Sequence, residues 1–164
     1  MLVLNPAAAT AVFALAVTVH NVEEAIWLPA FARSTGARAV GAADVRIVDV
    51  VFTLGVYAVS VSAVMWRGPI AVYAPAGIGA AMALNAFVPH LAATIRFRRY
   101  APGTATGLAL DLPSGAALIS SLPAAGWVSA SVLMWAVPVG IIGVGAVTVA
   151  LLWFVPRVTR RFGG

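Results

Sequence analysis

Hydrophobic residues occur along this chain in long, nearly continuous stretches that short polar connections separate. A stretch of about 20 apolar residues is long enough for an α-helix to cross a hydrocarbon core roughly 30 Å thick. Runs of this length are typical of membrane-spanning helices. We therefore predict an all-α integral membrane bundle of about five transmembrane helices, a single domain over 1–164 whose spans cover residues 6–28, 46–65, 70–95, 104–122 and 129–155.

Proline, glycine and tryptophan mark where the predicted helices begin and end. Pro29 is expected to end the first helix, beside the interfacial residue Trp27. Residues 66–69, Trp-Arg-Gly-Pro, are typical of a tight turn between the second and third helices. Residues 100–103, Tyr-Ala-Pro-Gly, are turn residues ahead of the fourth helix, and Trp153 marks an interface in the last.

The composition excludes several classes of protein. Of 164 residues, 62% are hydrophobic and 9% are charged, and the mean hydropathy of +1.01 is far above that of a water-soluble domain. Cysteine is absent, which excludes disulfides, thiolate metal sites and cysteine nucleophiles. The N-terminus lacks the positive region of a secretory signal, so we expect its first apolar stretch to be a permanent helix.

The basic charge points to membrane orientation and not to nucleic acid. The formal charge is +5, but all ten basic residues are arginines in or beside the short connections, a pattern that reports topology. With five spans, nine arginines share one side and Arg67 lies opposite. Positive charge stays cytoplasmic, so we expect the N-terminus outside and the C-terminus inside the inner (plasma) membrane. The nine are Arg33, Arg38, Arg46, Arg96, Arg98, Arg99, Arg157, Arg160 and Arg161.

The first predicted span contains four polar residues that lipid should not tolerate, namely His20, Asn21, Glu23 and Glu24. A charge at the centre of a bilayer costs about 2.5–3.5 kcal/mol even on the lower scales, so something must compensate for it. At about 100° per residue, Glu24 lies about 40° from His20 and Glu23 about 60° to the other side. One face of the helix therefore presents all three groups.

Other spans add polar residues at a similar predicted depth, near the cytoplasmic leaflet. These are Asp49 in the second span, Asn85 and His90 in the third, and Asp111 in the fourth. Imidazole and carboxylate groups on neighbouring helices are suitable ligands for Zn, Fe or Mn, as a mononuclear or a dinuclear site. The candidate metal ligands are His20, Glu23, Glu24, His90, Asp49 and Asp111.

The order of these residues resembles a known family. The segment from His20 to Glu24, followed by Asn85, His90 and the Tyr-Ala-Pro-Gly of 100–103, is similar to the bacterial membrane family named for its H-x-x-E-E motif. The resemblance runs from the first helix to the start of the fourth. It implies a site built on this motif and names no activity.

Three functions stay open. The first is a metal-dependent membrane enzyme that acts on an apolar or lipid-like substrate from the inner leaflet. The second is a metal-free acid or base enzyme that isomerises, cyclises or hydrolyses a lipid. In either enzyme the candidate catalytic groups are Glu23, Glu24, Asn85 and Tyr100.

The third function is a membrane scaffold or partner subunit, and self-association is left open. Its glutamates would pair with Arg33, Arg38 or Arg96, while Arg46 would neutralise Asp49 from three residues away. Small residues suit close helix packing in lipid, and they occur at Gly77 with Ala81 and at Gly140, Gly143 and Ala146.

Overall fold

The computed structural model describes residues 4–36, 41–67 and 69–162, and over these residues the chain is helical without strands. Within this part of the chain, five helical segments are long and apolar enough to cross a membrane. They are Pro6–Ser34, Ala42–Trp66, Ala71–Phe97, Thr104–Ala124 and Ala130–Arg161. The predicted all-α fold with about five spans is confirmed, and the chain has the architecture of a multi-pass membrane protein.

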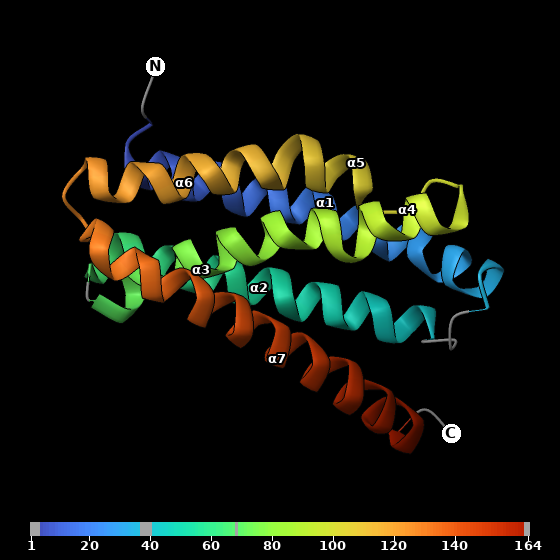
Figure 1. The fold of residues 1–164 in the computed structure, drawn as a ribbon. Helices are drawn as coiled ribbons and strands as arrows, with labels where there is room; N and C mark the ends of the chain where they lie inside the picture. The colour runs from blue at the N-terminus through green and yellow to red at the C-terminus, as the bar shows by residue number, and fades with distance from the viewer. Residues whose placement is uncertain (1–3, 37–40, 68, 163–164) are drawn as a thin grey trace.

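Figure 1 shows successive helices running alternately back and forth between the two ends of the bundle. Some spans consist of several consecutive elements, so the full element order is longer than five. It is α1 (Pro6–Ser34), α2 (Ala42–Trp66), α3 (Pro69–Asn85), η1 (Ala86–Leu91), α4 (Ala92–Phe97), α5 (Thr104–Thr106), η2 (Gly107–Asp111), α6 (Leu112–Ala124) and α7 (Ala130–Phe162).

The prediction that Pro29 ends the first helix is wrong, because α1 continues to Ser34. A proline inside a helix removes one N–H and leaves the carbonyl four residues earlier without its partner. That carbonyl belongs to Ala25, and the Arg46 side chain of α2 donates a hydrogen bond to it at 3.4 Å. The arginine thus occupies the carbonyl that Pro29 frees.

The third span is interrupted where the sequence suggested a continuous helix. Val88, immediately before Pro89, has the extended backbone angles φ −131° and ψ 110° inside η1. The residue before a proline disfavours helical angles, which accounts for a break at this point. The chain resumes its helix as α4, so Asn85 and His90 lie on opposite sides of the break.

Two pairs of facing glycines bring the helices of the bundle into backbone contact. A Cβ built on Gly140 of α7 would lie 2.2 Å from the Cα of Gly77 on α3, and one on Gly115 of α6 would lie 2.8 Å from the Gly79 carbonyl. In lipid, such close packing replaces the hydrophobic effect as the force between helices. The expected roles of Gly77 and Gly140 are confirmed, whereas Gly143 faces open space.

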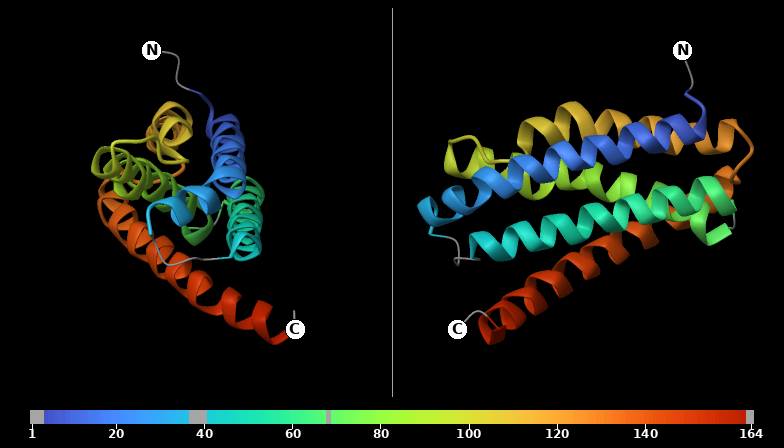
Figure 2. Two further views of the ribbon diagram at one scale, coloured as in Figure 1. Left: turned by 90° about the vertical axis from the view of Figure 1, so that its right-hand side faces the viewer. Right: turned by 180° about the vertical axis from the view of Figure 1, so that it is seen from behind.

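The helices surround a core that α1, α2, α3 and α6 share. α3 packs against α2, α6 and α7, and α1 packs against α2 and α6. Figure 2 shows α7 on the outside of this group, diverging from α3 toward the C-terminus. The largest fully buried side chains of the core include Phe13, Val17, Leu118 and Leu122.

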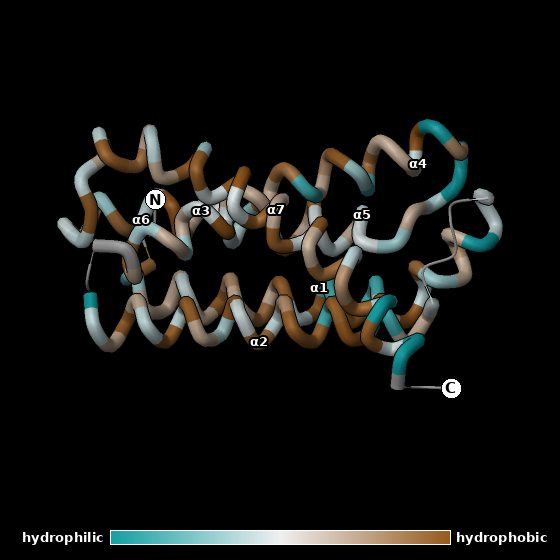
Figure 3. The backbone as a smooth tube through the Cα atoms, turned by 90° about the horizontal axis from the view of Figure 1, so that it is seen from below, coloured by the Kyte–Doolittle hydropathy of each residue, from teal (hydrophilic) through white to brown (hydrophobic). Residues whose placement is uncertain are grey.

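The arginines follow the predicted distribution between the two ends of the bundle. Figure 3 shows apolar residues along the helices and hydrophilic segments gathered toward their ends. Eight of the nine arginines assigned to one side lie at the end where α1 and α4 finish and α2 begins; Arg38 lies outside the described residues. Arg67 lies at the other end, where it stacks on the Trp127 ring at 4.6 Å. Gly68 of the predicted turn also lies outside the described residues.

Gly140→Ala is expected to lower the free energy of unfolding by about 1–3 kcal/mol, because the new methyl group must displace backbone on α3. Gly143→Ala on the same helix is the matched control, since its methyl group meets no atom within 4 Å. Thermal or denaturant unfolding in one detergent would compare the two. Equal stability of the variants would contradict a tight crossing of α3 and α7.

Candidate functional site

Three side chains converge between α1 and the break in the third span. His20, Glu24 and His90 each offer one ligand atom, and these atoms all lie within 4.8 Å of one another. Glu24 Oε1 lies 3.3 Å from His90 Nε2, and Glu24 Oε2 lies 3.6 Å from His20 Nε2. Ligands held about 2.0–2.2 Å from a tetrahedral metal are roughly 3.3–3.6 Å apart, so these separations suit one ion.

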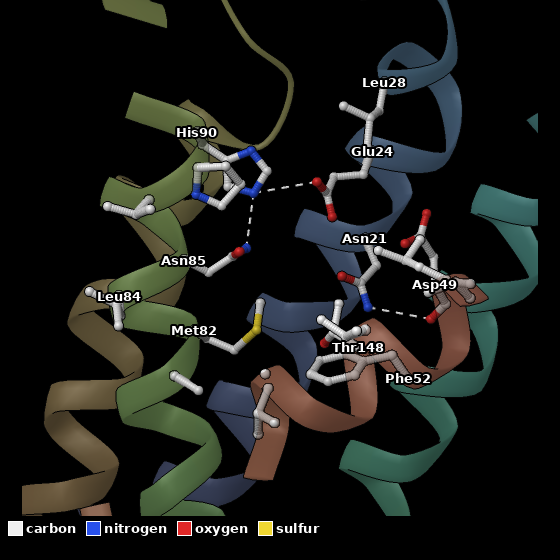
Figure 4. Close-up of a pocket in the computed structure, with 18 of the residues that line it drawn as sticks. Asn21, Glu24, Leu28, Asp49, Phe52, Met82, Leu84, Asn85, His90 and Thr148 are labelled. Carbon is white, nitrogen blue, oxygen red and sulfur yellow. Dashed lines mark hydrogen bonds and ion pairs between the residues drawn. The ribbon is translucent and has the colours of Figure 1, made fainter. Parts of the chain in front are cut away.

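Local structure explains why the three groups meet. His20 and Glu24 are four residues apart on α1 and therefore share a face. Asn85 and His90 would point in directions about 140° apart on a regular helix. Because the helix is broken at Val88, the Asn85 amide nitrogen instead lies 2.9 Å from His90 Nε2 and 3.3 Å from His20 Nε2. Figure 4 shows Asn85 and Glu24 approaching His90 together.

The other ring nitrogen of His20, Nδ1, contacts two polar side chains of the fourth span. Nδ1 lies 3.1 Å from the Thr106 hydroxyl and 3.1 Å from Asp111 Oδ2. Thr106 donates its hydroxyl hydrogen to Glu23 Oε2 at 2.6 Å, so it must accept from His20. His20 therefore carries a proton on Nδ1 and turns the lone pair of Nε2 toward Glu24 and Asn85.

Asp111 is fully buried, and within the described part of the chain neither of its carboxylate oxygens has a hydrogen bond of good geometry. The polar contact that it makes is the 3.1 Å approach of Oδ2 to His20 Nδ1. A histidine that binds a metal usually offers its second nitrogen to a carboxylate or carbonyl in this way. Asp111 thus supports His20 and does not join the group of ligand atoms.

The turn at 100–103 covers both histidine rings. The His90 ring donates a hydrogen bond to the Pro102 carbonyl, which leaves Nε2 to face Glu24 and Asn85. Gly103 has φ +88°, and a Cβ there would lie 2.6 Å from His90 Cε1 and 3.0 Å from His20 Cε1. The backbone conformation and the contact with the rings both require glycine at this position.

Glu23 points away from Glu24, toward the same turn. It accepts hydrogen bonds from the hydroxyl groups of Thr106 and Tyr100, and the Tyr100 hydroxyl in turn accepts the Ala105 N–H at 3.2 Å. Partial burial and the hydrogen bond to Glu23 raise the pKa of the Tyr100 hydroxyl, which keeps it a donor at neutral pH. The candidate catalytic residues Glu23 and Tyr100 therefore contact each other and fasten the turn to α1.

Asp49 lines the same cavity as Glu24, from the neighbouring helix α2. Its Oδ2 is buried and has no hydrogen bond within the described residues, while its backbone carbonyl accepts from Asn21 at 3.4 Å. Asn21 also donates to Thr53 Oγ1 at 2.7 Å. The expected neutralisation of Asp49 by Arg46 is not observed, because no ion pair joins these two described residues and Arg46 donates to Ala25 instead.

The alternative pairing of the glutamates with arginine is also not observed within the described residues. Glu24 forms its ion-pair contacts with His20 and His90, and neither Arg33 nor Arg96 pairs with either glutamate. Arg38 lies outside the described residues. The site therefore contains carboxylates that no described arginine neutralises.

The cavity has a volume of about 450 Å³ and opens beside the site between α2, α3 and α7. Glu24, Asp49, Asn85 and His90 line one part of it, as Figure 4 shows, and apolar side chains line most of the rest. A concave, mostly apolar cavity with a few convergent polar groups is the usual form of a small-molecule site.

The depth of the site follows from the helix ends. Asp49, His90 and Asp111 each lie seven residues, or about 10 Å, from the arginine-rich end of their spans. His20 lies fourteen residues from Ser34, farther than predicted, because Pro29 does not end α1. In three of the four spans the groups thus lie nearer the arginine-rich end.

Sequence reasoning did not identify Thr106, which links His20 to Glu23, or the contribution of α7 to the cavity. A threonine in an apolar helix carries no specific signal, because its hydroxyl can satisfy itself on the preceding turn. α7 contains no acidic residue, histidine or asparagine that would connect it with the site. Neither feature had a pattern from which it could be predicted.

The comparisons with known proteins match the part of the chain that contains these residues. A family model described as a protein of unknown function with HXXEE motif matches residues 11–118, which include every polar residue of the site described above. The chain is 35% identical over 112 residues to uncharacterized protein YrkK of Bacillus subtilis (strain 168), covering 66% of this chain and 71% of that protein. No solved structure matches the chain.

Tyr100→Phe and Glu23→Gln are expected to be energetically coupled, since each substitution weakens the same hydrogen bond. A double-mutant cycle on the free energy of unfolding should give a coupling of about 1–3 kcal/mol, as for a hydrogen bond to a charged group. Tyr73→Phe is the control, because the described structure holds no hydrogen bond from that hydroxyl. Additive effects of the two substitutions would show that the turn is not fastened through this pair.

Proposed function

The chain belongs to the HXXEE family, and we propose that it is a membrane enzyme in which His20, Glu24 and His90 hold one divalent transition metal beside an apolar cavity. The observation that carries the proposal is the spacing of the three ligand atoms. In addition, each histidine has a polar contact on its other ring nitrogen, His20 with Asp111 and His90 with the Pro102 carbonyl. Two imidazoles and one carboxylate form the donor set of hydrolytic zinc sites and of non-haem iron sites. Zinc, iron and manganese are therefore the candidate ions.

The proposed site is mononuclear. Glu23 faces the turn at 100–103, Asp111 contacts Nδ1 of His20, and Asp49 lines the cavity from α2. Among the described residues, the search for metal-ligand geometry yields a single group, made of His20, Glu24 and His90. The geometry thus favours one ion over the dinuclear alternative.

When bound, such an ion would polarise a substrate oxygen or activate a water molecule. The side chains around it would have separate tasks. Asp111 and Thr106 orient His20, and the Pro102 carbonyl orients His90. The unpaired Oδ2 of Asp49, which lines the same cavity as Glu24, is suited to accept a proton from the substrate or from water.

The substrate of the proposed enzyme is apolar or lipid-like, since apolar side chains form most of the cavity lining. The eight described arginines at one end support a cytoplasmic position for that end, with the C-terminus inside. The site then lies nearer the inner leaflet of the plasma membrane. A lipid-like substrate would enter from that leaflet.

A metal-free acid or base enzyme is the second candidate, and one contact favours it. The Asn85 amide nitrogen approaches Nε2 of both histidines, so the imidazole lone pairs already have a donor. In that case Glu24 and Asp49 would be the groups that move protons in the cavity. A metal would have to displace Asn85 from these lone pairs.

Elemental analysis of the purified full-length chain distinguishes the two candidates. We expect about one zinc, iron or manganese ion per chain, with loss of the ion in Glu24→Gln and His90→Ala. Glu23→Gln is the matched control, because the neighbouring carboxylate faces away from the site. Metal should also stabilise the wild-type fold, by about 2.7 kcal/mol at a hundred times the dissociation constant, and should leave Glu24→Gln unchanged.

Asp111→Asn is expected to weaken metal affinity about 10–100-fold, as usual for a carboxylate that supports a ligating histidine. Titration of the metal-free protein with zinc would measure the change. Wild-type protein that takes up no ion after chelation and reconstitution, and that does not respond to zinc in thermal unfolding, would leave the metal-free enzyme as the better explanation.

A further inference from the structure

One face of α7 forms a wall of the cavity. The lining residues on this helix are spaced three or four positions apart in an unbroken helical stripe. They extend over twelve residues, whose eleven steps cover about 16 Å along the helix axis. The stripe consists of Ile141, Val144, Gly145, Thr148, Val149 and Leu152.

α7 is held against the bundle at two points, and the cavity lies between them. Toward its N-terminus, Gly140 packs on the backbone of Gly77. Toward its C-terminus, the Thr159 hydroxyl donates to Asp44 Oδ1 at the start of α2, at 2.7 Å. Figures 1 and 2 show α7 crossing α3 and then diverging from it. The divergence leaves room that neighbouring side chains do not fill.

The shape and polarity of the cavity define a class of ligand. About 450 Å³ distributed over a length of about 16 Å is a narrow space. Its charged and amide groups, Glu24, Asp49, Asn85 and His90 among them, belong to α1, α2, the end of α3 and η1, whereas α7 contributes one hydroxyl. A straight apolar chain with a polar end group fits this arrangement.

Gly145 has a particular place in this wall. A Cβ added to it would meet no atom within 4 Å, although the residue lines the cavity. The space in front of this glycine is therefore open to a ligand. Gly143 is equally open by the same measure but does not line the cavity.

We propose that the face of α7 around Gly145 determines specificity, by setting the length of the straight apolar chain that can place its polar end at Glu24 and His90. The proposal rests on the proposed function of that site. α7 lies outside residues 11–118, which match the family model, while the polar groups lie inside them. The groups proposed for chemistry thus lie in the part of the chain that matches the family model. The proposed selection of the substrate lies in the last helix, outside that part.

The test uses photoreactive straight-chain 1-alkanols of increasing length, each with a diazirine at the far end, and the full-length chain in lipid nanodiscs. The fraction of labelling that excess unlabelled alkanol displaces measures specific binding in the cavity. The apparent affinity for the site, referred to the alkanol concentration in water, should rise about fourfold per methylene until the chain fills the cavity, and then stop rising. Mass spectrometry should locate the displaced label on residues 141–152 or on the facing Phe52 and Met82.

Gly145→Leu and Gly145→Phe should shorten the longest chain that is accepted and reduce displaceable labelling by the longest alkanols about tenfold or more. Gly145→Ala should have a smaller effect in the same direction, and it guards against a misfolded larger variant. Gly143→Leu and Gly143→Phe are the matched controls and should label like the wild type. Thermal unfolding of each variant verifies its fold.

Labelling without a length limit, label on the outer face of α7, or equal effects at Gly143 and Gly145 would overturn the proposal. Metal content, measured on the same preparations, keeps the two proposals apart. Wild-type protein that contains no metal but shows the length limit would disprove the metal site and support the role of α7 in selecting chain length. Protein that contains metal but shows no displaceable labelling would support the metal site and disprove the role of α7 in selecting chain length.

Discussion

Lipid offers no water to a polar side chain, and this constraint governs the arrangement around His20. Every donor and acceptor placed inside the bundle must find its partner in the protein, at several kcal/mol for each one that does not. His20 is fully buried, and it meets this demand through the Thr106 hydroxyl on Nδ1 and the Asn85 amide on Nε2. Helices far apart in the sequence are therefore positioned by one imidazole ring.

The irregular backbone segments of the bundle position the polar residues around His20. The break at Val88 brings Asn85 and His90 to the same point, and the π-helical turn η2 contains Asp111 at its end. π-helical turns are rare and occur frequently at functional sites. The turn at 100–103 then covers the rings, with Gly103 in a conformation and a contact that no other residue tolerates as well. Regular helices would have separated these groups.

The sequence predicted which polar residues lie near one another better than which partner each of them contacts. The spans, the distribution of the arginines and the shared face of His20 and Glu24 follow from hydropathy, charge and helical spacing, which are local properties. The approach of His90 to them depends on the break at Val88, which those properties do not place. Pro29 was misassigned because its effect depends on Arg46, a partner on another helix. Glu23 and Glu24 both lay on the predicted face, yet Tyr100 and Thr106 draw the first away. The partner of each such residue is determined by tertiary contacts, which cannot be inferred from a single sequence.

The charges of the network give a physical reason to expect a cation in it. Glu24 and Asp111 both approach His20, Asp49 lines the same cavity as Glu24, and within the described residues no ion pair connects these carboxylates to an arginine. One imidazolium could balance one carboxylate, but it would give up the Nε2 lone pair that Asn85 approaches. A divalent ion at Nε2 would use that lone pair, compensate two carboxylates at once and leave Nδ1–H to donate to Thr106, with Asp111 Oδ2 at 3.1 Å. For a site enclosed in lipid, this is the charge balance that keeps every group in the position where the fold holds it.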